Sequence, residues 1–152
     1  MTTFADLYRD EWARAARLAF VIVGDREVAS EVAQEAMARA YQHWRRVSRL
    51  ERPGAWVRRV TIRLAVRSRA RARALPALVG VAHSSLDAGD TDLAAALHAL
   101  SAQQRATIVL HYLEDLSVAE VADVLGCRPG TVKAHLHRAR ARLAELLGEE
   151  AR

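Results

Sequence analysis

The fold of this chain is decided by one stretch near its C-terminal end, Leu116-Ser-Val-Ala-Glu-Val-Ala-Asp-Val-Leu-Gly-Cys-Arg-Pro-Gly-Thr-Val-Lys-Ala-His-Leu-His-Arg-Ala-Arg140. Ser117 and Glu120 have the Ser-x-x-Glu spacing of a capping box, in which each side chain binds a backbone N–H group at a helix start. Gly126 suits the left-handed conformation that ends a helix, and Pro129 suits the first turn of the next helix. The stretch therefore predicts a helix-turn-helix, whose second helix enters the major groove of DNA.

The second predicted helix has one apolar face and one basic face. Its apolar residues recur at helical spacing and are Val132, Leu136, Ala139 and Leu143. The opposite side carries Thr131, Lys133, Ala134, His137 and Arg138. Lysine and arginine reach phosphates or base edges, and arginine can hold guanine with two hydrogen bonds. An ordinary helical hairpin with a solvated basic face is the alternative; the agreement of caps, hinge glycine and one-sided charge favours DNA binding.

Length and composition limit the class of protein. A chain of 152 residues allows one domain or two small ones, and half of its residues are apolar with little glycine or proline, which is typical of a folded, helix-rich protein. The longest apolar run, Leu18 to Val23, is too short to span a bilayer, and the N-terminus lacks a signal-peptide pattern. A single cysteine, Cys127, excludes internal disulfides and predicts a cytoplasmic location.

Charge is distributed unevenly along the chain. Residues 1–75 hold 16 Arg and 8 acidic residues, a net charge of +8. Residues 76–152 hold 7 basic and 10 acidic residues, a net charge of −3. The arginine excess lies in the half without the helix-turn-helix, so a second polyanion-binding surface is predicted there.

Apolar periodicity and turn residues predict an all-α fold of two small helical domains. The first, residues 1–73, is a three-helix bundle with helices from Phe4 to Gly24, from Asp25 to about Val47, and from Pro53 into Arg73. Residues 74–90 gain Pro, Gly and Ser and are expected to be a linker. The second domain, residues 91–152, contains a helix from Asp90 to Leu100, a helix capped by Ser101-x-x-Gln104, and the helix-turn-helix.

The second helix of the first domain presents an acidic face. Glu27, Glu31 and Glu35 are four residues apart, so like charges stack, at a cost of ~0.2–0.5 kcal/mol per pair in isolation. Arg39 offsets part of this cost. Either a basic partner covers this face or it is a plain solvated surface.

The third helix carries a stripe of arginines. Arg59, Arg63 and Arg67 are four residues apart beside Trp56, and Arg58, Arg69, Arg71 and Arg73 widen the stripe. Arginine beside an aromatic ring holds single-stranded nucleic acid by charge and stacking. The alternatives are core packing for Trp56 and a solvated face for the arginines.

In this order the motifs resemble those of a bacterial extracytoplasmic-function (ECF) sigma factor of RNA polymerase, a member of the sigma-70 family with helical regions 2 and 4. The stretches that match region 2 are Ala29-Ser-Glu-Val-Ala-Gln-Glu35, Ala38-Arg-Ala-Tyr-Gln-His-Trp44 and Pro53-Gly-Ala-Trp-Val-Arg-Arg-Val60. The stretches that match region 4 are Leu100-Ser-Ala-Gln-Gln-Arg105, His111-Tyr-Leu-Glu-Asp-Leu-Ser117, Gly130-Thr-Val-Lys133 and His137-Arg-Ala-Arg-Ala-Arg-Leu143.

This resemblance implies a non-enzymatic factor that gives RNA polymerase its promoter specificity, with no catalytic residue, metal or cofactor. Residues implied to bind the clamp coiled coil of the polymerase core are Glu31, Gln34, Glu35 and Arg39. Those implied to melt and hold the −10 promoter element are Arg52, Trp56, Arg59, Arg63 and Arg67. Those implied to read the −35 duplex are Arg128, Thr131, Lys133, His137 and Arg138. Region 4 is also implied to contact the polymerase flap, and an anti-sigma protein is an expected partner.

Some positions depart from the family pattern. Arg63 and Arg67 stand where the family usually has Asn and Asp, and the Asn commonly contacts a −10 base. Glu31-Val32 replaces the commoner Asp-Leu. Arg128 replaces a capping Ser or Thr, which loses about 1 kcal/mol of cap and adds a charge that reaches phosphate.

Two other classes of protein compete with this interpretation. A stand-alone helix-turn-helix regulator would bind duplex DNA without polymerase, but it does not explain the acidic face or the arginine stripe. A metal protein or enzyme is disfavoured because His135 and His137, two apart on a helix, diverge. The other histidines form no acid–base set with a nearby carboxylate and nucleophile.

Overall fold

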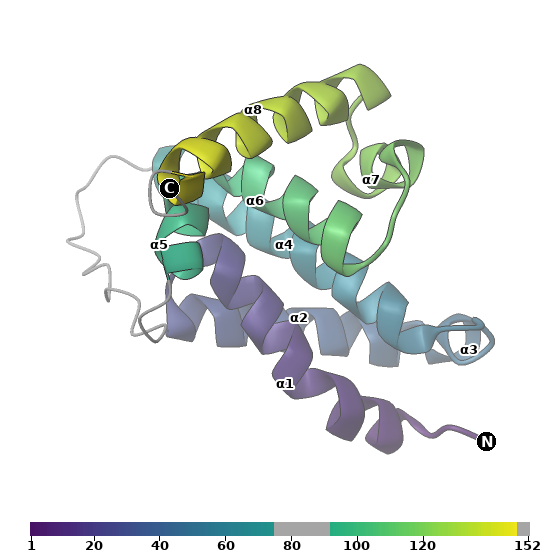
Figure 1. Cartoon of the computed structure of the whole chain (residues 1–152). Helices are drawn as coiled ribbons and strands as arrows, with labels where there is room; N and C mark the ends of the chain where they lie inside the picture. Colours follow the sequence, from purple (N-terminus) through teal and green to yellow (C-terminus); the bar gives the residue numbers. More distant parts are fainter. Residues whose placement is uncertain (75–91, 149–152) are drawn as a thin grey trace. The chain divides into compact units, whose positions relative to one another are not determined.

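A computed structural model of the chain describes residues 1–74 and 92–148, and every regular element in these two ranges is a helix (Figure 1). The chain divides into two compact units, Met1–Ser84 and Ser85–Arg152. The predicted all-α fold with two helical domains is confirmed. Apart from Ala74, the last residue of a helix, the predicted linker lies outside the described residues, and its boundaries stay predictions.

The first unit is a bundle of three long helices and one short one. Its elements are α1 (Phe4–Val23), α2 (Arg26–Gln42), α3 (Trp44–Val47) and α4 (Pro53–Ala74). Helices α1, α2 and α4 all pack against one another. Each of the three predicted helices is therefore present, the second of them divided into α2 and α3, and the bundle closes around one core.

Local caps set the ends of α1 and α2. Gly24 ends α1 in the left-handed conformation, with φ of 75°, and the Asp25 carboxylate accepts the N–H groups of Glu27 and Val28 at 2.9 and 3.1 Å. Both were predicted. The sequence analysis missed the capping box formed by Thr3 and Asp6 at the start of α1. Hydrogen bonds from the backbone N–H and then the hydroxyl of Thr3 hold the pKa of the Asp6 carboxyl below its usual value.

The prediction of one continuous helix from Asp25 to Val47 is wrong. The chain turns at His43, which has φ −106° and ψ 24°, and α3 follows as a separate short helix. After this turn the Trp44 ring packs edge-on against Phe4, with ring centroids 5.7 Å apart, and Val47 is fully buried. Packing between segments 40 residues apart thus overrides the helical periodicity.

Small side chains fill the centre of the first bundle. Its buried cluster consists of Leu7, Ala15, Ala33, Ala36, Met37, Ala40 and Val57. Half-buried rings surround this cluster, and Trp12, Trp44 and Trp56 all belong to this outer layer. The tryptophans therefore help to close the bundle, which agrees with core packing as one of the interpretations of Trp56.

One ion pair joins α1 to the second turn of α4. The Arg58 guanidinium donates to the Glu11 carboxylate at 2.8 Å, and both side chains are at most 16% exposed. The carboxylate lies over Gly54, where an added Cβ would come within 2.2 Å of Glu11 Oε1. Glycine at this position therefore leaves room for the pair. Arg58 does not widen the basic stripe as the sequence indicated.

The second unit contains the helix-turn-helix. Its elements are α5 (Asp92–His98), α6 (Ala102–Ile108), a π-helical turn η1 (Val109–Leu113), α7 (Val118–Leu125) and α8 (Pro129–Gly148). Helix α8 packs against α5, α6 and α7. The helix predicted to reach Leu100 ends at His98, and its predicted first residue, Asp90, lies outside the described residues.

A buried arginine closes the turn between α5 and α6. Arg105 is 4% exposed, and its Nη1 donates to the carbonyls of Leu97, His98 and Leu100 at 3.5, 3.3 and 3.1 Å. These carbonyls at the end of a helix lack partners within the helix. The predicted capping box of Ser101 and Gln104 starts α6 directly after this turn.

We predict that Gly54→Ala destabilises the first unit by about 1–2 kcal/mol, because the new methyl group displaces Glu11 from Arg58. The three tryptophans lie in this unit, so the free energy of unfolding is measured by tryptophan fluorescence in urea. Gly130→Ala is the matched control. Gly130 also follows a proline at a helix start, and its added Cβ would meet nothing within 4 Å. By circular dichroism this control should be unchanged or up to about 1 kcal/mol more stable. An equal change in the free energy of unfolding in both variants would contradict the conclusion that Gly54 leaves room for the ion pair of Glu11 and Arg58.

Candidate nucleic-acid and protein-binding surfaces

The helix-turn-helix is built from the caps that the sequence predicted. Ser117 and Glu120 form the capping box of α7, with hydrogen bonds of 3.2 and 2.8 Å. Gly126 takes φ of 67° and ends α7, and the Cys127 N–H bonds the carbonyl of Ala122 at 3.1 Å. Pro129 is the first residue of α8. The turn between α7 and α8 is thus fixed by local hydrogen bonds.

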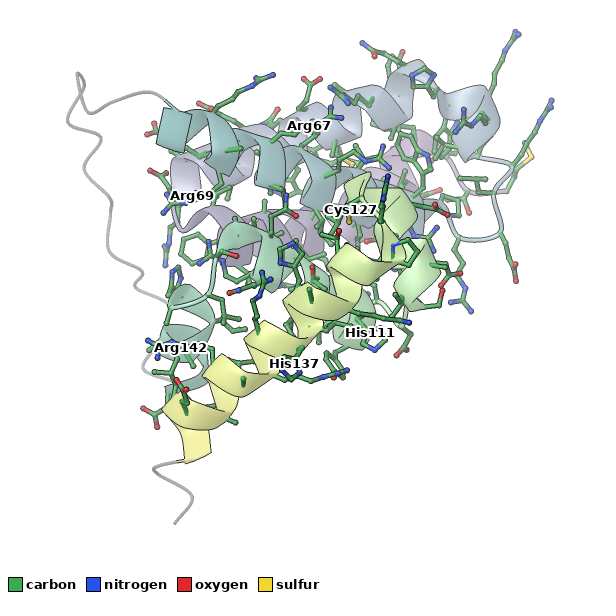
Figure 2. All side chains as sticks on the ribbon, turned by 90° about the horizontal axis from the view of Figure 1, so that it is seen from above. Arg67, Arg69, His111, Cys127, His137 and Arg142 are labelled. Carbon is green, nitrogen blue, oxygen red and sulfur yellow. The ribbon has the colours of Figure 1, made fainter. Side chains whose placement is uncertain are left out.

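Helix α8 buries one side and exposes the other. Val132, Leu136 and Ala139 are at most 3% exposed, whereas the predicted fourth core residue, Leu143, is half-buried. The residues predicted to read duplex DNA are all exposed on α8 or at its start, and they are Arg128, Thr131, Lys133, His137 and Arg138. The structure therefore brings this predicted set onto one unit, with His137 on the exposed part of α8 (Figure 2).

The two histidines of α8 differ in environment, as their spacing predicted. His135 is half-buried, and burial first, then the charge of Arg138, holds the pKa of its imidazole below the usual value. His137 is exposed. Among residues 1–74 and 92–148, no three His, Cys, Asp or Glu side chains are grouped so that they could hold a metal ion.

Arg140 is held by the π-helical turn. Its Nε donates to the Tyr112 hydroxyl at 2.5 Å, and its guanidinium lies 5.5 Å from the centre of the Tyr112 ring. The neighbouring His111 bonds the Leu116 carbonyl through Nδ1 at 2.8 Å. Sequence reasoning missed this turn, and with it the exposed apolar surface of Tyr112 and Leu113, which are 50% and 63% exposed.

The acidic face of α2 is exposed as predicted. We define it as Glu27, Glu31, Gln34 and Glu35, all four of which are exposed. Arg39 is half-buried and bonds Glu35 through Nε at 3.1 Å. Exposed pairs of this kind stabilise a protein by less than about 1 kcal/mol. The face therefore remains rich in solvated acidic groups.

Two hollows flank the ridge formed by Glu31 and Glu35. The outer hollow lies on α2 alone and is also lined by Ser30, Gln34 and Ala38. The other is a groove of about 350 Å³ between α2 and α4, which we call the α2–α4 groove. Its lining residues are Val28, Glu31, Val32, Glu35, Arg39, Leu64, Arg67, Ser68 and Arg71.

The residues predicted to bind the −10 strand lie directly before α4 and along it. Arg52 is exposed immediately before α4, and Trp56, Arg59 and Arg63 are half-buried along it. Trp56 packs against the core cluster, so its core role is real although its ring stays partly accessible. Arg67 lies on α4 (Figure 2) and lines the α2–α4 groove with Glu31, Glu35 and Arg39, the residues predicted to bind polymerase.

This combination defines a class of protein: an all-helical factor of two units, the second of which contains a DNA-binding helix-turn-helix. A family model of sigma-70 region 2 matches residues 6–75, and one of sigma-70 region 4 matches residues 90–143. The described residues contain no helix long and apolar enough to cross a membrane.

Proteins that are similar along nearly the whole chain are also sigma factors. The RNA polymerase sigma-E factor of Streptomyces coelicolor is 34% identical over 91% of this chain and 81% of its own length. The ECF RNA polymerase sigma factor SigE of Mycolicibacterium smegmatis is 31% identical over 98% of this chain, which spans 63% of that relative. The sigma factor RpoE of Bartonella quintana, solved with the anti-sigma factor NepR, superposes with a TM-score of 0.69 over 95% of this chain and 96% of that chain, at 25% identity.

The chain belongs to the ECF sigma factors of the sigma-70 family. Sigma factors are transcription initiation factors, a class distinct from enzymes.

We predict that Arg128→Ser stabilises the second unit and weakens duplex binding. The Arg128 carbonyl accepts the first N–H groups of α8, from Thr131 and Val132, so a serine there would cap the helix and add about 1 kcal/mol. Loss of one phosphate contact should reduce the salt slope of duplex binding by about 0.9. Arg128→Ala is the control. It should reduce the salt slope of duplex binding as much as Arg128→Ser does, without an increase in the free energy of unfolding. An unchanged slope in both variants would rule out the phosphate contact.

Proposed function

We propose that this chain directs promoter-specific initiation by bacterial RNA polymerase in the cytoplasm. In this proposal the acidic face of α2 docks on the clamp coiled coil of the core enzyme. The start of α4 holds the unwound −10 strand, and the exposed side of α8 reads the −35 duplex. One observation supports this proposal best. This member of the family carries a helix-turn-helix in one unit, and its other unit exposes an acidic face and a basic helix.

The two DNA surfaces differ in the way that this function requires. Helix α8 exposes charged and polar side chains and contains no Phe, Tyr or Trp, which suits base edges and phosphates of a closed duplex. The start of α4 combines arginines with the partly accessible Trp56, which suits unstacked bases. A factor that binds unpaired strand more tightly than duplex shifts the equilibrium toward open DNA and needs no bond chemistry.

Two further contacts complete the proposal. The exposed Tyr112 and Leu113 on η1 offer an apolar surface of the kind that a second polymerase element, the flap, would cover. An anti-sigma protein is the proposed inhibitor, because the similar Bartonella sigma factor was solved in complex with one.

The clamp assignment predicts that the double change Glu31→Lys and Glu35→Lys abolishes binding to core polymerase and run-off transcription. Charge reversal places like charges against a complementary partner, which costs several kcal/mol. Asp10→Lys, which makes one such reversal of charge at an exposed position of α1, is the control and should leave both measurements intact. Tryptophan fluorescence checks that the bundle is folded. Core binding by the double variant at the normal affinity would refute the clamp assignment.

The recognition-helix assignment predicts that Lys133→Ala with Arg138→Ala weakens binding of the holoenzyme to a −35 duplex. Each lost base contact should cost ~1–3 kcal/mol, measured as the change in affinity between the cognate and a scrambled −35 sequence. Arg142→Ala is the matched control on the same helix, because Arg142 pairs with Glu145 at 3.1 Å. If Arg142→Ala reduces the difference in affinity between the two −35 sequences as much as the double variant does, Lys133 and Arg138 do not recognise the −35 bases.

A further inference from the structure

The α2–α4 groove has walls of opposite charge. Glu31 and Glu35 line it from α2, and Arg67 and Arg71 line it from α4. Between them lie three apolar residues, Val28, Val32 and Leu64, which are less exposed than the charged ones. A groove of this composition fits a protein segment with one apolar side chain flanked by a basic and an acidic one.

The charges across the groove do not satisfy one another. The ion pair of Glu35 is with Arg39 on its own helix, at 3.1 Å. In the described part of the chain, neither Arg67 nor Arg71 lies within 4 Å of a carboxylate oxygen of Glu31 or Glu35. Water solvates these groups in the free protein. A partner that covers the groove must therefore supply matching charges, because a buried unpaired charge is costly.

The groove is continuous with the proposed docking face. Glu31 and Glu35 line both the outer hollow of α2 and the α2–α4 groove, so they form the ridge between the two. A partner that covers this ridge from the acidic face therefore reaches the edge of the groove. The opposite wall of the groove carries the guanidinium groups of Arg67 and Arg71 on α4.

We infer that the α2–α4 groove is part of the polymerase-docking surface, and that Arg67 binds an acidic residue of the core enzyme instead of the −10 strand. This inference rests on the proposed function of the α2 face. Glu31 and Glu35 would repel a phosphate backbone laid along the groove, which makes DNA a poor occupant. Arg59 and Arg63 are not among the groove's lining residues and keep their proposed DNA role.

The test uses the full chain with Arg67→Glu, and Arg59→Glu as the matched change on the same helix. The first measurement is the affinity for core polymerase. The second is the salt dependence with which preassembled holoenzyme binds a fork DNA that carries an unpaired −10 strand. For Arg67→Glu we expect a loss of core affinity of roughly tenfold or more and an unchanged salt slope. For Arg59→Glu we expect normal core affinity and a slope smaller by about 0.7, the value for one single-strand phosphate.

Arg67→Gln guards against misfolding, since it removes the charge without introducing repulsion, and it should reduce core affinity in the same direction by a smaller factor. A normal core affinity in both Arg67 variants would overturn the inference. So would a reduced salt slope in either of them, because Arg67 would then touch DNA. If the Glu31 and Glu35 double variant also binds core polymerase with normal affinity, the proposed function of the acidic face is wrong. If the double variant loses core affinity and the Arg67 variants do not, the acidic face is a docking surface and the α2–α4 groove is not part of it.

Discussion

The first unit depends on close packing along one side of α2. Ala29, Ala33, Ala36 and Ala40 are at most 2% exposed there, and α1 and α4 both pack against this helix. Small side chains allow neighbouring helices to approach closely, and the contact leaves little freedom to rotate a helix about its axis. Fixing the buried side of α2 also fixes the opposite side. These buried alanines therefore determine the orientation of the acidic face and the width of the groove beside it.

Features set by neighbours within about five residues could be predicted from the sequence. The capping boxes at Ser101 and Ser117, the helix ends at Gly24 and Gly126, and the two sides of α8 all depend on local hydrogen bonds or helical periodicity. Contacts between distant segments could not be predicted. The turn at His43 serves ring packing with residue 4, and the pair of Arg58 joins residues 47 apart in the chain. No local pattern marks either contact.

The arginine stripe turns gradually around α4 along the length of the helix. Arg59, Arg63 and Arg67 follow one another by four residues, but a helical turn takes 3.6 residues. Each step therefore rotates the side chain by about 40° around α4. Over two steps the stripe leaves the side that carries Arg59 and reaches the side that faces α2, where Arg67 lines the groove. Arg59 and Arg67 are eight residues apart on this helix of 22 residues, so their directions around the helix axis differ by about 80°.

Division into two units has a consequence for promoter binding. In the proposed mechanism each unit contacts DNA through only a few residues, and contacts of this size give weak binding when they act alone. Covalent connection makes the second contact intramolecular, so that its effective concentration can reach the millimolar range when the spacing fits. Docking of the first unit on polymerase would fix where the second unit must bind relative to it. In the proposed mechanism, therefore, the core enzyme determines the allowed distance between the −10 and −35 elements, while the side chains of α4 and α8 determine their sequences.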